Sequence, residues 1–531
     1  MAQPRTNSTV TYDVLVVGGG NAGFCSAISA AQSGAKRVLL IDKCPRSWAG
    51  GNSHFTAGAF RTVHAGLSDI LPLVNNVDFE TASQIDLESY TKENFLNDLS
   101  RMTTGRFEPE LGKALIEESL DAVKWLAKNG VRFQLSFNRQ AYKIDGRFKF
   151  WGGMCLKTED GGKGLIVDHQ QAAKRAGVTV FYSTAAKGII LDPKTGAFKS
   201  LLAEDQNGRS LMINAKAVIL AAGGFESNPR MRSQYLGPGW DLAHVRGTPY
   251  NTGECLEMAI RDISAKQAGQ WSGCHSVAWD ANSPANSGDR EISNEFTKSG
   301  YPLGITLNTQ GERFFDEGSD IRNYTYAKFG RAILAQPQSL AFQIWDSQGI
   351  AWLRDEEYRP EIVERINAST IEKLAQTLAK SHGLSSPDNF VRTVKAYNEA
   401  VYAHRKENAE RGLKWDPAVK DGLSTQSSRT QLKVPKSNWA LPLDQGPFMA
   451  VKVGCGVTFT FGGLAVDPKT SGVISLSGKA VAGVFCAGEM VGGLFYDNYP
   501  GGSGLTSGAV FGRKAGINAA AVAAREISSK L

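Results

Sequence analysis

Apolar runs near the N-terminus predict a strand, a tight turn, a helix and a second strand. The run Val14–Val17 leads into the glycine cluster Gly18–Gly23, and an alanine-rich segment of helical length, Phe24–Gln32, follows. A second apolar run, Arg37–Asp42, ends on a carboxylate. Such glycines let the backbone approach a pyrophosphate at a helix N-terminus, and the acid accepts ribose hydroxyls. The pattern predicts a dinucleotide site and leaves NAD and FAD both open.

Further apolar patterns continue this organisation. From Tyr90 to Asn129, apolar residues recur at the three- and four-residue spacing of helices. We expect strands at Val178–Asp192 and Ser200–Met212, with a turn between them. Ala215–Gly224 is predicted to be a buried strand that ends in glycines and can return the chain to the nucleotide sheet.

The region from about residue 250 to 440 has more loops, aromatic and polar residues, with helices expected at Thr370–Lys380 and Asn389–Arg405. The strand-then-glycine pattern returns at Ala480–Glu489, and glycine-rich Gly492–Gly508 leads into a last helix at Ala515–Ile527. We therefore expect an α/β fold with a discontinuous Rossmann-like FAD- or NAD-binding domain, residues 1–250 and 445–531. Residues 251–444 would form an inserted α+β substrate-capping domain.

Composition fits a large globular chain. The 531 residues are 42% hydrophobic and 21% charged, so more than one domain is expected. The net charge of +7 is spread along the chain without a basic block, which argues against a nucleic-acid partner. It would suit an anionic substrate. No segment approaches the apolar length of a membrane span.

The seven cysteines, at 25, 44, 155, 255, 274, 455 and 486, form no CxxC pair. This scatter favours reduced thiols in an intracellular compartment and argues against an iron–sulfur cluster or a zinc site. No CxxCH haem attachment occurs. We expect no metal, and electrons would leave to a separate acceptor or to oxygen.

The two ends of the sequence carry targeting information of different kinds. The first residues lack the apolar stretch of a signal peptide. The last three, Ser529-Lys530-Leu531, match the peroxisomal address that an import receptor reads. We expect a peroxisomal protein that binds this receptor, and a cytoplasmic one otherwise.

The second glycine-ended strand, near the C-terminus, favours FAD over NAD. An NAD-dependent dehydrogenase has no need for it, whereas later segments of a flavoprotein hold the ribityl chain and ring of an extended FAD. Glu489 is placed to meet ribityl or phosphate-side groups, and an acid there is also favoured by a helix dipole. His54 could link a flavin covalently, but nothing in the sequence requires it, so we expect non-covalent FAD.

Several segments together resemble the fumarate reductase/succinate dehydrogenase flavoprotein superfamily, and within it the tricarballylate dehydrogenase group. The likeness runs from about residue 11 to 520. The segments that resemble the superfamily are Gly18–Gly23, Gly50–Ser53, Ala222–Phe225, Asn251–Glu254 and Phe485–Glu489; those that resemble the group are Phe148–Gly153, Tyr235–Trp240, Trp271–His275, Asn323–Lys328 and Asn498–Gly504.

The resemblance implies that FAD is held by residues spread over the chain. The residues expected to bind the cofactor are Gly18, Gly20, Asn21, Ala22, Gly23, Asp42, Lys43, Gly50, Gly51, Asn52, Ser53, Ala57, Gly58, Ala186, Ala222, Gly223, Gly253, Glu489, Ser503 and Leu505.

The resemblance also implies FAD-dependent oxidation or reduction of a C–C bond next to an activating group. In dehydrogenation a base removes the α-proton and a hydride leaves the β-carbon for flavin N5. By motif position, the catalytic candidates are His275, Glu295 with Lys298, and Arg322. Arg322 would bind substrate and take part in proton transfer with these neighbours or with nearby tyrosines, although an arginine is a poor base. An internal salt bridge of Arg322 and a merely buried His275 are the alternatives.

Two positions depart from the fumarate reductase pattern. Thr458-Phe-Thr-Phe-Gly-Gly463 stands where those enzymes have a histidine, and Tyr499 stands where they have an arginine, so two carboxylate ligands are missing. A tyrosine here also resembles ketosteroid dehydrogenases, in which it holds a ketone oxygen; alternatively, Tyr499 packs against the flavin. Arg61 and Arg246 are further cations near the expected flavin loops.

Three hypotheses follow. The first is a dehydrogenase acting on an activated small molecule, with a tricarballylate-like acid as the expected substrate. The second is a ketone desaturase, a fumarate-type reductase or an oxygen-using oxidase. The third is a flavin-binding protein without turnover, which the retained candidates His275, Glu295, Arg322 and Tyr499 argue against.

Overall fold

The computed structural model describes residues 8–528 and divides the chain into two compact units. Unit 1 comprises Met1–Pro238, Gly247–Cys274 and Phe459–Leu531, and unit 2 comprises Gly239–Arg246 and His275–Thr458. These bounds differ from the expected ones, because residues 251–274 belong to unit 1, and Gly239–Arg246 and residues 445–458 belong to unit 2. The targeting tripeptide Ser529–Leu531 lies outside the described residues.

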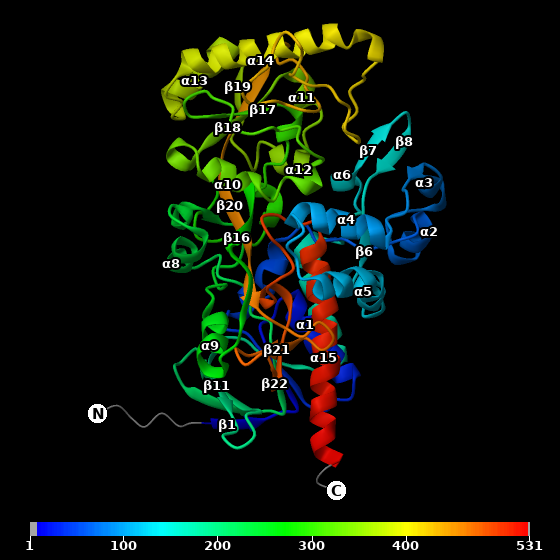
Figure 1. Ribbon diagram of the computed structural model, residues 1–531, viewed down its shortest axis with the longest axis vertical. Coiled ribbons are helices and arrows are strands. Elements are labelled where there is room, and N and C mark those ends of the chain that lie inside the picture. Colours follow the sequence, from blue (N-terminus) through cyan, green and yellow to red (C-terminus); the bar gives the residue numbers. More distant parts are fainter. Residues whose placement is uncertain (1–7, 529–531) are drawn as a thin grey trace, which may run out of the picture. The chain divides into compact units, whose positions relative to one another are not determined.

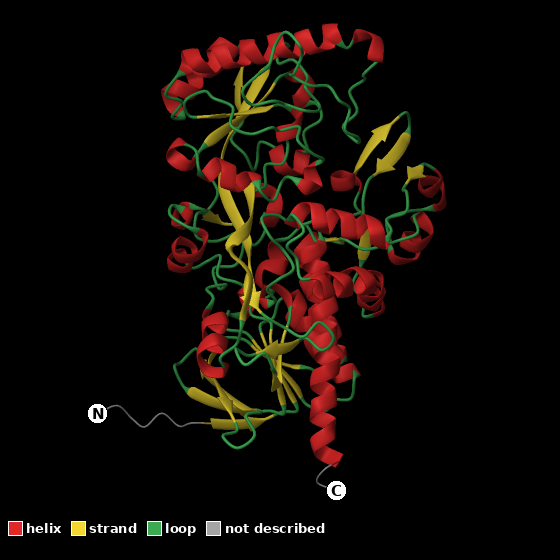
Figure 2. Ribbon diagram, in the orientation of Figure 1, coloured by secondary structure: helices red, strands yellow, loops and turns green. Residues whose placement is uncertain are grey.

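A six-stranded sheet lies at the centre of unit 1 (Figures 1 and 2). The central strands are fully buried, which explains their continuous apolar runs. Both predicted returns to the nucleotide sheet are confirmed, since β14 pairs in parallel with β2 and with β22. The strand order is β10 (Thr179–Phe181), β3 (Val38–Ile41), β2 (Val14–Val17), β14 (Ala217–Leu220), β22 (Ala480–Cys486) and β21 (Gly472–Ile474).

Two helices, α1 (Asn21–Gln32) and α15 (Ser503–Ser528), pack against each other in unit 1. The expected last helix began at Ala515, but α15 begins twelve residues earlier within the segment read as glycine-rich loop. Gly508, Gly512 and Gly516 recur every fourth residue, so they share one face of the helix. A Cβ on Gly512 would lie 2.6 Å from Ala22 O of α1. These glycines therefore allow close helix packing instead of breaking the helix.

The second sheet of unit 1 has the order β1 (Ser8–Thr11), β13 (Ser210–Asn214), β12 (Phe198–Asp205) and β11 (Thr184–Leu191). The prediction of a single strand at Val178–Asp192 is wrong. The chain breaks at Ser183, which has φ +52°, and its halves join different sheets as β10 and β11. The strand expected at Ser200–Met212 is likewise two strands, because a turn ending at Gly208 (φ +71°) separates them.

The helices expected between Tyr90 and Asn129 are confirmed as α4 (Lys92–Thr103) and α5 (Pro109–Lys128). Thr91 caps α4 through a reciprocal bond pair with Asn94, which satisfies end groups that the helix leaves open. The other elements of unit 1 are β4 (Ala59–Phe60), α2 (Leu67–Ile70), α3 (Phe79–Ser83), β5 (Ile85–Asp86), β6 (Phe133–Leu135), α6 (Phe137–Gln140), β7 (Ala141–Ile144), β8 (Arg147–Phe150), β9 (Leu156–Thr158), α7 (Gly161–Arg175), α8 (Pro229–Met231) and α9 (Glu254–Ile263).

Unit 2 is built on a mixed sheet covered by helices. The two expected helices are confirmed as α13 (Ile371–Ser381) and α14 (Pro387–Glu407). The sheet order is β15 (His244–Val245), β20 (Phe448–Leu464), β18 (Ala341–Trp345) and β17 (Ile305–Asn308), with β16 (Gln267–Asp280) and β19 (Ile366–Ala368) also pairing with β20. The first part of β16, Gln267–Cys274, and the last part of β20, Phe459–Leu464, belong to unit 1. The short helices are α10 (Phe329–Leu334), α11 (Ser347–Ile350) and α12 (Asp355–Tyr358).

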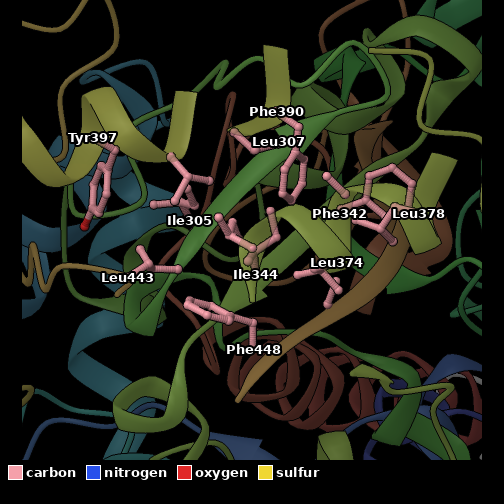
Figure 3. Close-up of a cluster of buried hydrophobic side chains, with 14 of the residues drawn as sticks. Ile305, Leu307, Phe342, Ile344, Leu374, Leu378, Phe390, Tyr397, Leu443 and Phe448 are labelled. Atoms are coloured by element: carbon pink, nitrogen blue, oxygen red, sulfur yellow. The ribbon is translucent and has the colours of Figure 1, made fainter. Parts of the chain in front are cut away.

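The core of unit 2 forms where helices meet this sheet (Figure 3). Leu374 and Leu378 of α13 and Phe390 of α14 pack in one buried cluster with Phe342 and Ile344 of β18. Each buried aliphatic or aromatic side chain of this kind contributes about 1.5–3 kcal/mol. Among residues 8–528, no helix combines the length and the apolar character needed to cross a membrane.

Candidate functional site

The turn between β2 and α1 in unit 1 has the geometry expected of a pyrophosphate-binding turn. Gly18 has φ +107°, and a Cβ there would lie 2.6 Å from Ala221 C, so only glycine fits. A Cβ on Gly23 would overlap the carbonyl oxygen of Gly18. Gly20 is the N-cap of α1 and brings no side chain to the helix end, which leaves that end suited to an anion.

Asp42 lies at the end of β3 and ties this strand to the glycine turn. Its Oδ2 accepts from Gly19 N at 2.8 Å, and its Oδ1 accepts from Cys44 N at 3.0 Å. The structure thus brings the predicted acid to the predicted glycines. Lys43, the next residue, instead donates to Thr252 Oγ1 at 2.6 Å and pairs with Glu254 at 2.7 Å, beside Gly253.

Asn21 connects the start of α1 with three distant segments. Its N–H donates to Ser53 Oγ at 3.0 Å, and its Nδ2 donates to Leu505 O at 2.9 Å. Its Oδ1 lies 2.9 Å from Nε2 of His169, a buried residue that the sequence reasoning missed. Burial lowers the pKa of His169 to about 3, so this imidazole is neutral and donates to the amide oxygen.

The remaining predicted cofactor residues fall in four places within unit 1. Gly50 and Gly51 both have positive φ values, +110° and +53°, in a tight loop before Asn52. Gly58 (φ +69°) follows Ala57, and its carbonyl accepts from Thr158 N at 2.9 Å. Ser503 begins α15. Ala186 lies within β11, where it pairs with Ala203 of β12.

A carboxyl pair, fully buried Glu226 with partly exposed Glu489, lies beside the Ala222–Gly224 turn. The two carboxyl groups interact closely enough to raise the pKa of Glu226, whose Oε1 accepts from Asn251 Nδ2 at 2.6 Å and from Asn52 Nδ2. A Cβ on Gly224 would lie 2.8 Å from Glu489 Cδ. Glu226 was not predicted, although an acid directly after Gly-Gly-Phe was visible in the sequence.

Tyr499 lies in an aromatic cluster in unit 1. Its ring centroid is 5.1 Å from that of Phe459, 5.5 Å from Phe495 and 6.5 Å from Phe461. The tyrosine is 7% exposed. Edge-to-face rings of this kind hold one another in fixed positions. The two phenylalanines of the Thr458–Gly463 stretch therefore surround the tyrosine, although the chain separates them by about forty residues.

Arg61, a candidate cation, is fully buried and held inside unit 1. Its Nη1 lies 3.1 Å from Asp98 Oδ2 and 2.8 Å from the hydroxyl of Tyr90, and its Nε donates to Gly501 O at 2.8 Å. Arg61 therefore fastens the loop after Tyr499 to α4. Asp98 is therefore a counter-ion of the buried Arg61 guanidinium.

In unit 2, Arg246 and His275 lie among aromatic and polar side chains. Arg246 Nη1 donates to Thr458 Oγ1 at 2.8 Å, and its guanidinium lies 5.6 Å from the ring centroid of Trp279. His275 makes an edge contact with Tyr326 at 5.2 Å between ring centroids. Burial and the charge of Arg246 together bring the pKa of His275 well below its usual value. At neutral pH this histidine is therefore uncharged.

Arg322 begins a 3-10 turn, Arg322–Tyr324, in unit 2 and is half-buried. Burial raises the pKa of Tyr301 and Tyr358, and the nearby guanidinium of Arg322 opposes that rise. The turn places Tyr326 one helical step beyond Arg322, with Tyr326 N donating to Arg322 O at 3.0 Å. Tyr326 thus contacts the backbone of Arg322 through its N–H and the ring of His275 through its own ring.

Glu295 and Lys298 take different partners. The Glu295 carboxylate pairs with Arg359 at 2.6 Å. Lys298 Nζ is buried and donates to two backbone carbonyls, Glu295 O at 2.8 Å and Glu357 O at 2.7 Å. Burial lowers the pKa of Lys298 to about 8. In this structure the lysine is a buried internal donor, and its role in proton transfer stays a prediction.

These arrangements can support flavin chemistry. Unit 1 has a glycine turn at the N-terminus of α1, with Asp42 bonded to that turn. Later segments of unit 1 meet at Glu226 and Glu489. Together these features fit an extended FAD. Unit 2 offers guanidinium groups and a neutral imidazole, which suit an anion and a proton transfer.

Comparisons with known proteins agree with this geometry. The FAD_binding_2 family (FAD binding domain) matches residues 13–505. The chain is 28% identical over 510 residues to the probable fumarate reductase Ifc3 of Shewanella frigidimarina, which covers 96% of this chain and 75% of that protein. It is 26% identical over 550 residues to the vinyl phenol reductase of Lactiplantibacillus plantarum, covering 96% of each.

A solved structure is similar too. The open conformation of a flavocytochrome c3 fumarate reductase matches with a TM-score of 0.70 and 25% identity, covering 97% of this chain and 78% of that chain. The chain belongs to the FAD_binding_2 family, within the fumarate reductase/succinate dehydrogenase flavoprotein superfamily. It is an FAD-dependent oxidoreductase that acts on C–C bonds.

Proposed function

We propose that this chain dehydrogenates a C–C bond next to a carbonyl or carboxylate group of a small molecule that has an apolar or aromatic portion. The aromatic cluster around Tyr499 carries this proposal. Phe459, Phe461 and Phe495 give the tyrosine apolar walls, which favour an apolar group over a second carboxylate. A phenolic hydroxyl can donate to a carbonyl oxygen and stabilise the charge that develops there.

Unit 2 would supply the polar part of the chemistry. Arg246 and Arg322 can bind an anionic oxygen, and an enolate-like charge would be stabilised by such groups. His275 is neutral at physiological pH, so it can accept a proton. When bound, FAD supplies the hydride acceptor, and we expect it to be held non-covalently. The substrate loses its α-proton and a β-hydride and gains a double bond.

A second substrate class is a tricarballylate-like acid. The segments resembling the tricarballylate dehydrogenase group support it, and Arg246 with Arg322 would then bind carboxylates. The reverse reaction, reduction of an activated double bond, is supported by the names of two relatives, which are a fumarate reductase and a vinyl phenol reductase. One set of assays separates these possibilities.

The test is anaerobic mixing of the yellow protein with each substrate class, followed by flavin absorbance. Activated ketones should bleach the flavin, and Tyr499→Phe should slow this by about 10²–10³-fold while retaining FAD. Tyr402→Phe is the matched control, because Tyr402 is an exposed tyrosine (49%) in unit 2 and should react normally. Arg322→Ala should abolish bleaching.

Other outcomes would redirect the proposal. Bleaching by tricarballylate alone, with Tyr499→Phe unaffected, would replace the carbonyl substrate by the acid. A third outcome would establish a reductase. In that case the flavin stays yellow with every compound, but once it has been reduced chemically, fumarate or a vinyl phenol reoxidises it. Lack of both reactions would leave a flavin-binding protein without turnover.

We further propose a peroxisomal location, with the import receptor as a partner through Ser529–Leu531. The support is the sequence of these three residues.

A further inference from the structure

The carboxyl pair of unit 1, Glu226 and Glu489, joins segments far apart in the chain. Glu226 Oε1 accepts from Asn251 Nδ2 at 2.6 Å and from Asn52 Nδ2. Glu489 Oε1 accepts from the N–H of Thr460 at 2.7 Å and from its hydroxyl at 3.1 Å. Five side chains from five segments thus form one network. The segments around Asn52, Glu226, Asn251 and Glu489 are the ones expected to hold FAD.

The pair needs one proton to form this network. Glu226 is 0% exposed, and two neighbouring carboxylates, one of them removed from water, would repel each other. Two amide groups donate to Glu226 Oε1, which leaves Oε2 to carry a proton toward Glu489. Thr460 gives Glu489 two donors, which favour the charged form of that carboxyl.

Electrostatics place the proton on Glu226. Burial, then the charge of Glu489, raise the pKa of Glu226 well above its usual value, and burial raises the pKa of Glu489 to about 6. Near pH 7 the pair therefore holds a single proton. Arg232 is a charged neighbour of the pair, and its Nη1 donates to the backbone oxygen of Glu226 at 2.8 Å.

We propose that Glu226 is a protonated positioning residue, whose hydrogen bond to Glu489 holds the FAD-binding segments of unit 1 together. FAD retention should then fall when rising pH removes this proton, because the dianionic pair drives Glu226 and Glu489 apart. The inference rests on FAD binding and is independent of the proposed substrate. Glutamine at position 226 would preserve the network, because its oxygen accepts from both amides and its NH₂ group donates to Glu489.

The experiment compares FAD retention against pH in the holoprotein, measured by flavin fluorescence after desalting. Wild type should retain FAD at pH 7 and release it as pH rises. Glu226→Gln should retain FAD at pH 7 with a flat profile over the same range. Glu226→Ala should bind FAD about 10- to 100-fold more weakly at every pH, because it leaves buried donors without an acceptor. Glu117→Gln, which changes an exposed carboxylate of unit 1, is the matched control and should follow wild type.

Infrared spectroscopy tests the proton directly. Wild type at pH 7 should show the carbonyl stretch of a buried protonated carboxylic acid, and Glu226→Gln should lack this band while still binding FAD. The proposal is overturned if the band persists in Glu226→Gln, if Glu226→Gln loses FAD with the same pH profile as wild type, or if Glu226→Ala retains FAD normally. Failure of any substrate to bleach the flavin would leave these readouts unchanged.

Discussion

Replacing Asp98 by alanine should destabilise unit 1 and loosen the loop that carries Tyr499. The Arg61 guanidinium is fully buried, and Asp98 is the acid paired with it, 3.1 Å away and 13% exposed. Removing one partner of a buried pair costs about 3–5 kcal/mol, because the remaining charge has lost its counter-ion. The partial exposure of Asp98 and the bond from Arg61 to the Tyr90 hydroxyl place the cost near the lower end, at about 3 kcal/mol.

The matched control is Asp86→Ala, which breaks the ion pair of Asp86 with Arg147. Both side chains are nearly half exposed, 44% and 46%, so water already screens this pair and its loss should cost much less than the loss of Asp98. At about 1 °C per kcal/mol for a chain of 531 residues, Asp98→Ala should lower Tm by ~3 °C and the control by clearly less. Thermal unfolding followed by circular dichroism measures this difference.

A double variant separates charge from packing. Arg61→Met combined with Asp98→Ala removes both charges, so it should be more stable than Asp98→Ala alone. Because Arg61 Nε also holds Gly501 O, Asp98→Ala should slow flavin reduction more than Asp86→Ala does. Equal melting temperatures for Asp98→Ala and Asp86→Ala would refute the reasoning, as would a double variant whose loss equals the sum of the single losses.

Three further predictions follow from other contacts. Gly23→Ala should lose FAD and lower Tm, because its Cβ overlaps the Gly18 carbonyl, whereas Gly188→Ala, with no atom nearer than 3.6 Å, should keep FAD; equal FAD contents would contradict this. The pKa of Lys298 is about 8 in the folded protein and 10.5 ordinarily. Between these two pH values the unfolded state therefore binds more protons than the folded state, so raising the pH favours folding. The contribution of Lys298 to unfolding free energy should therefore rise by up to about 3 kcal/mol from pH 8 to 10.5, and denaturant titrations should find this rise missing in Lys298→Met. Deleting Ser529–Leu531 should move a fluorescent fusion out of peroxisomes in a eukaryotic host, and unchanged localisation would reject the targeting proposal.

Local patterns determined much of unit 1. The apolar runs at β2, β3, β14 and β22 predicted buried parallel strands, since a strand buried on both faces needs continuous apolar residues. Gly18 and Gly23 predicted the turn, because a backbone that turns this tightly has no room for a Cβ at these two positions. The family resemblance then directed attention to Arg322, His275 and Tyr499.

The sequence alone did not determine the start of α15 or the split between β10 and β11. Glycines at every fourth residue weaken an isolated helix, and only packing against α1 makes them favourable. Ser183 breaks a strand because the two halves join different sheets, which depends on residues far along the chain. Glu226 and His169 were missed for the same reason.

Sequence spacing reports neighbours along one element, whereas a site depends on contacts between distant elements. Lys298 illustrates the difference: its spacing from Glu295 predicted a side-chain relay, but tertiary packing directs Lys298 to backbone carbonyls and Glu295 to Arg359. The sequence by itself determined the cofactor and the fold class, whereas the aromatic surroundings of Tyr499 come from tertiary contacts. Only the tertiary structure decided which charges are paired and which carboxyls share a proton, because burial and contact set those energies.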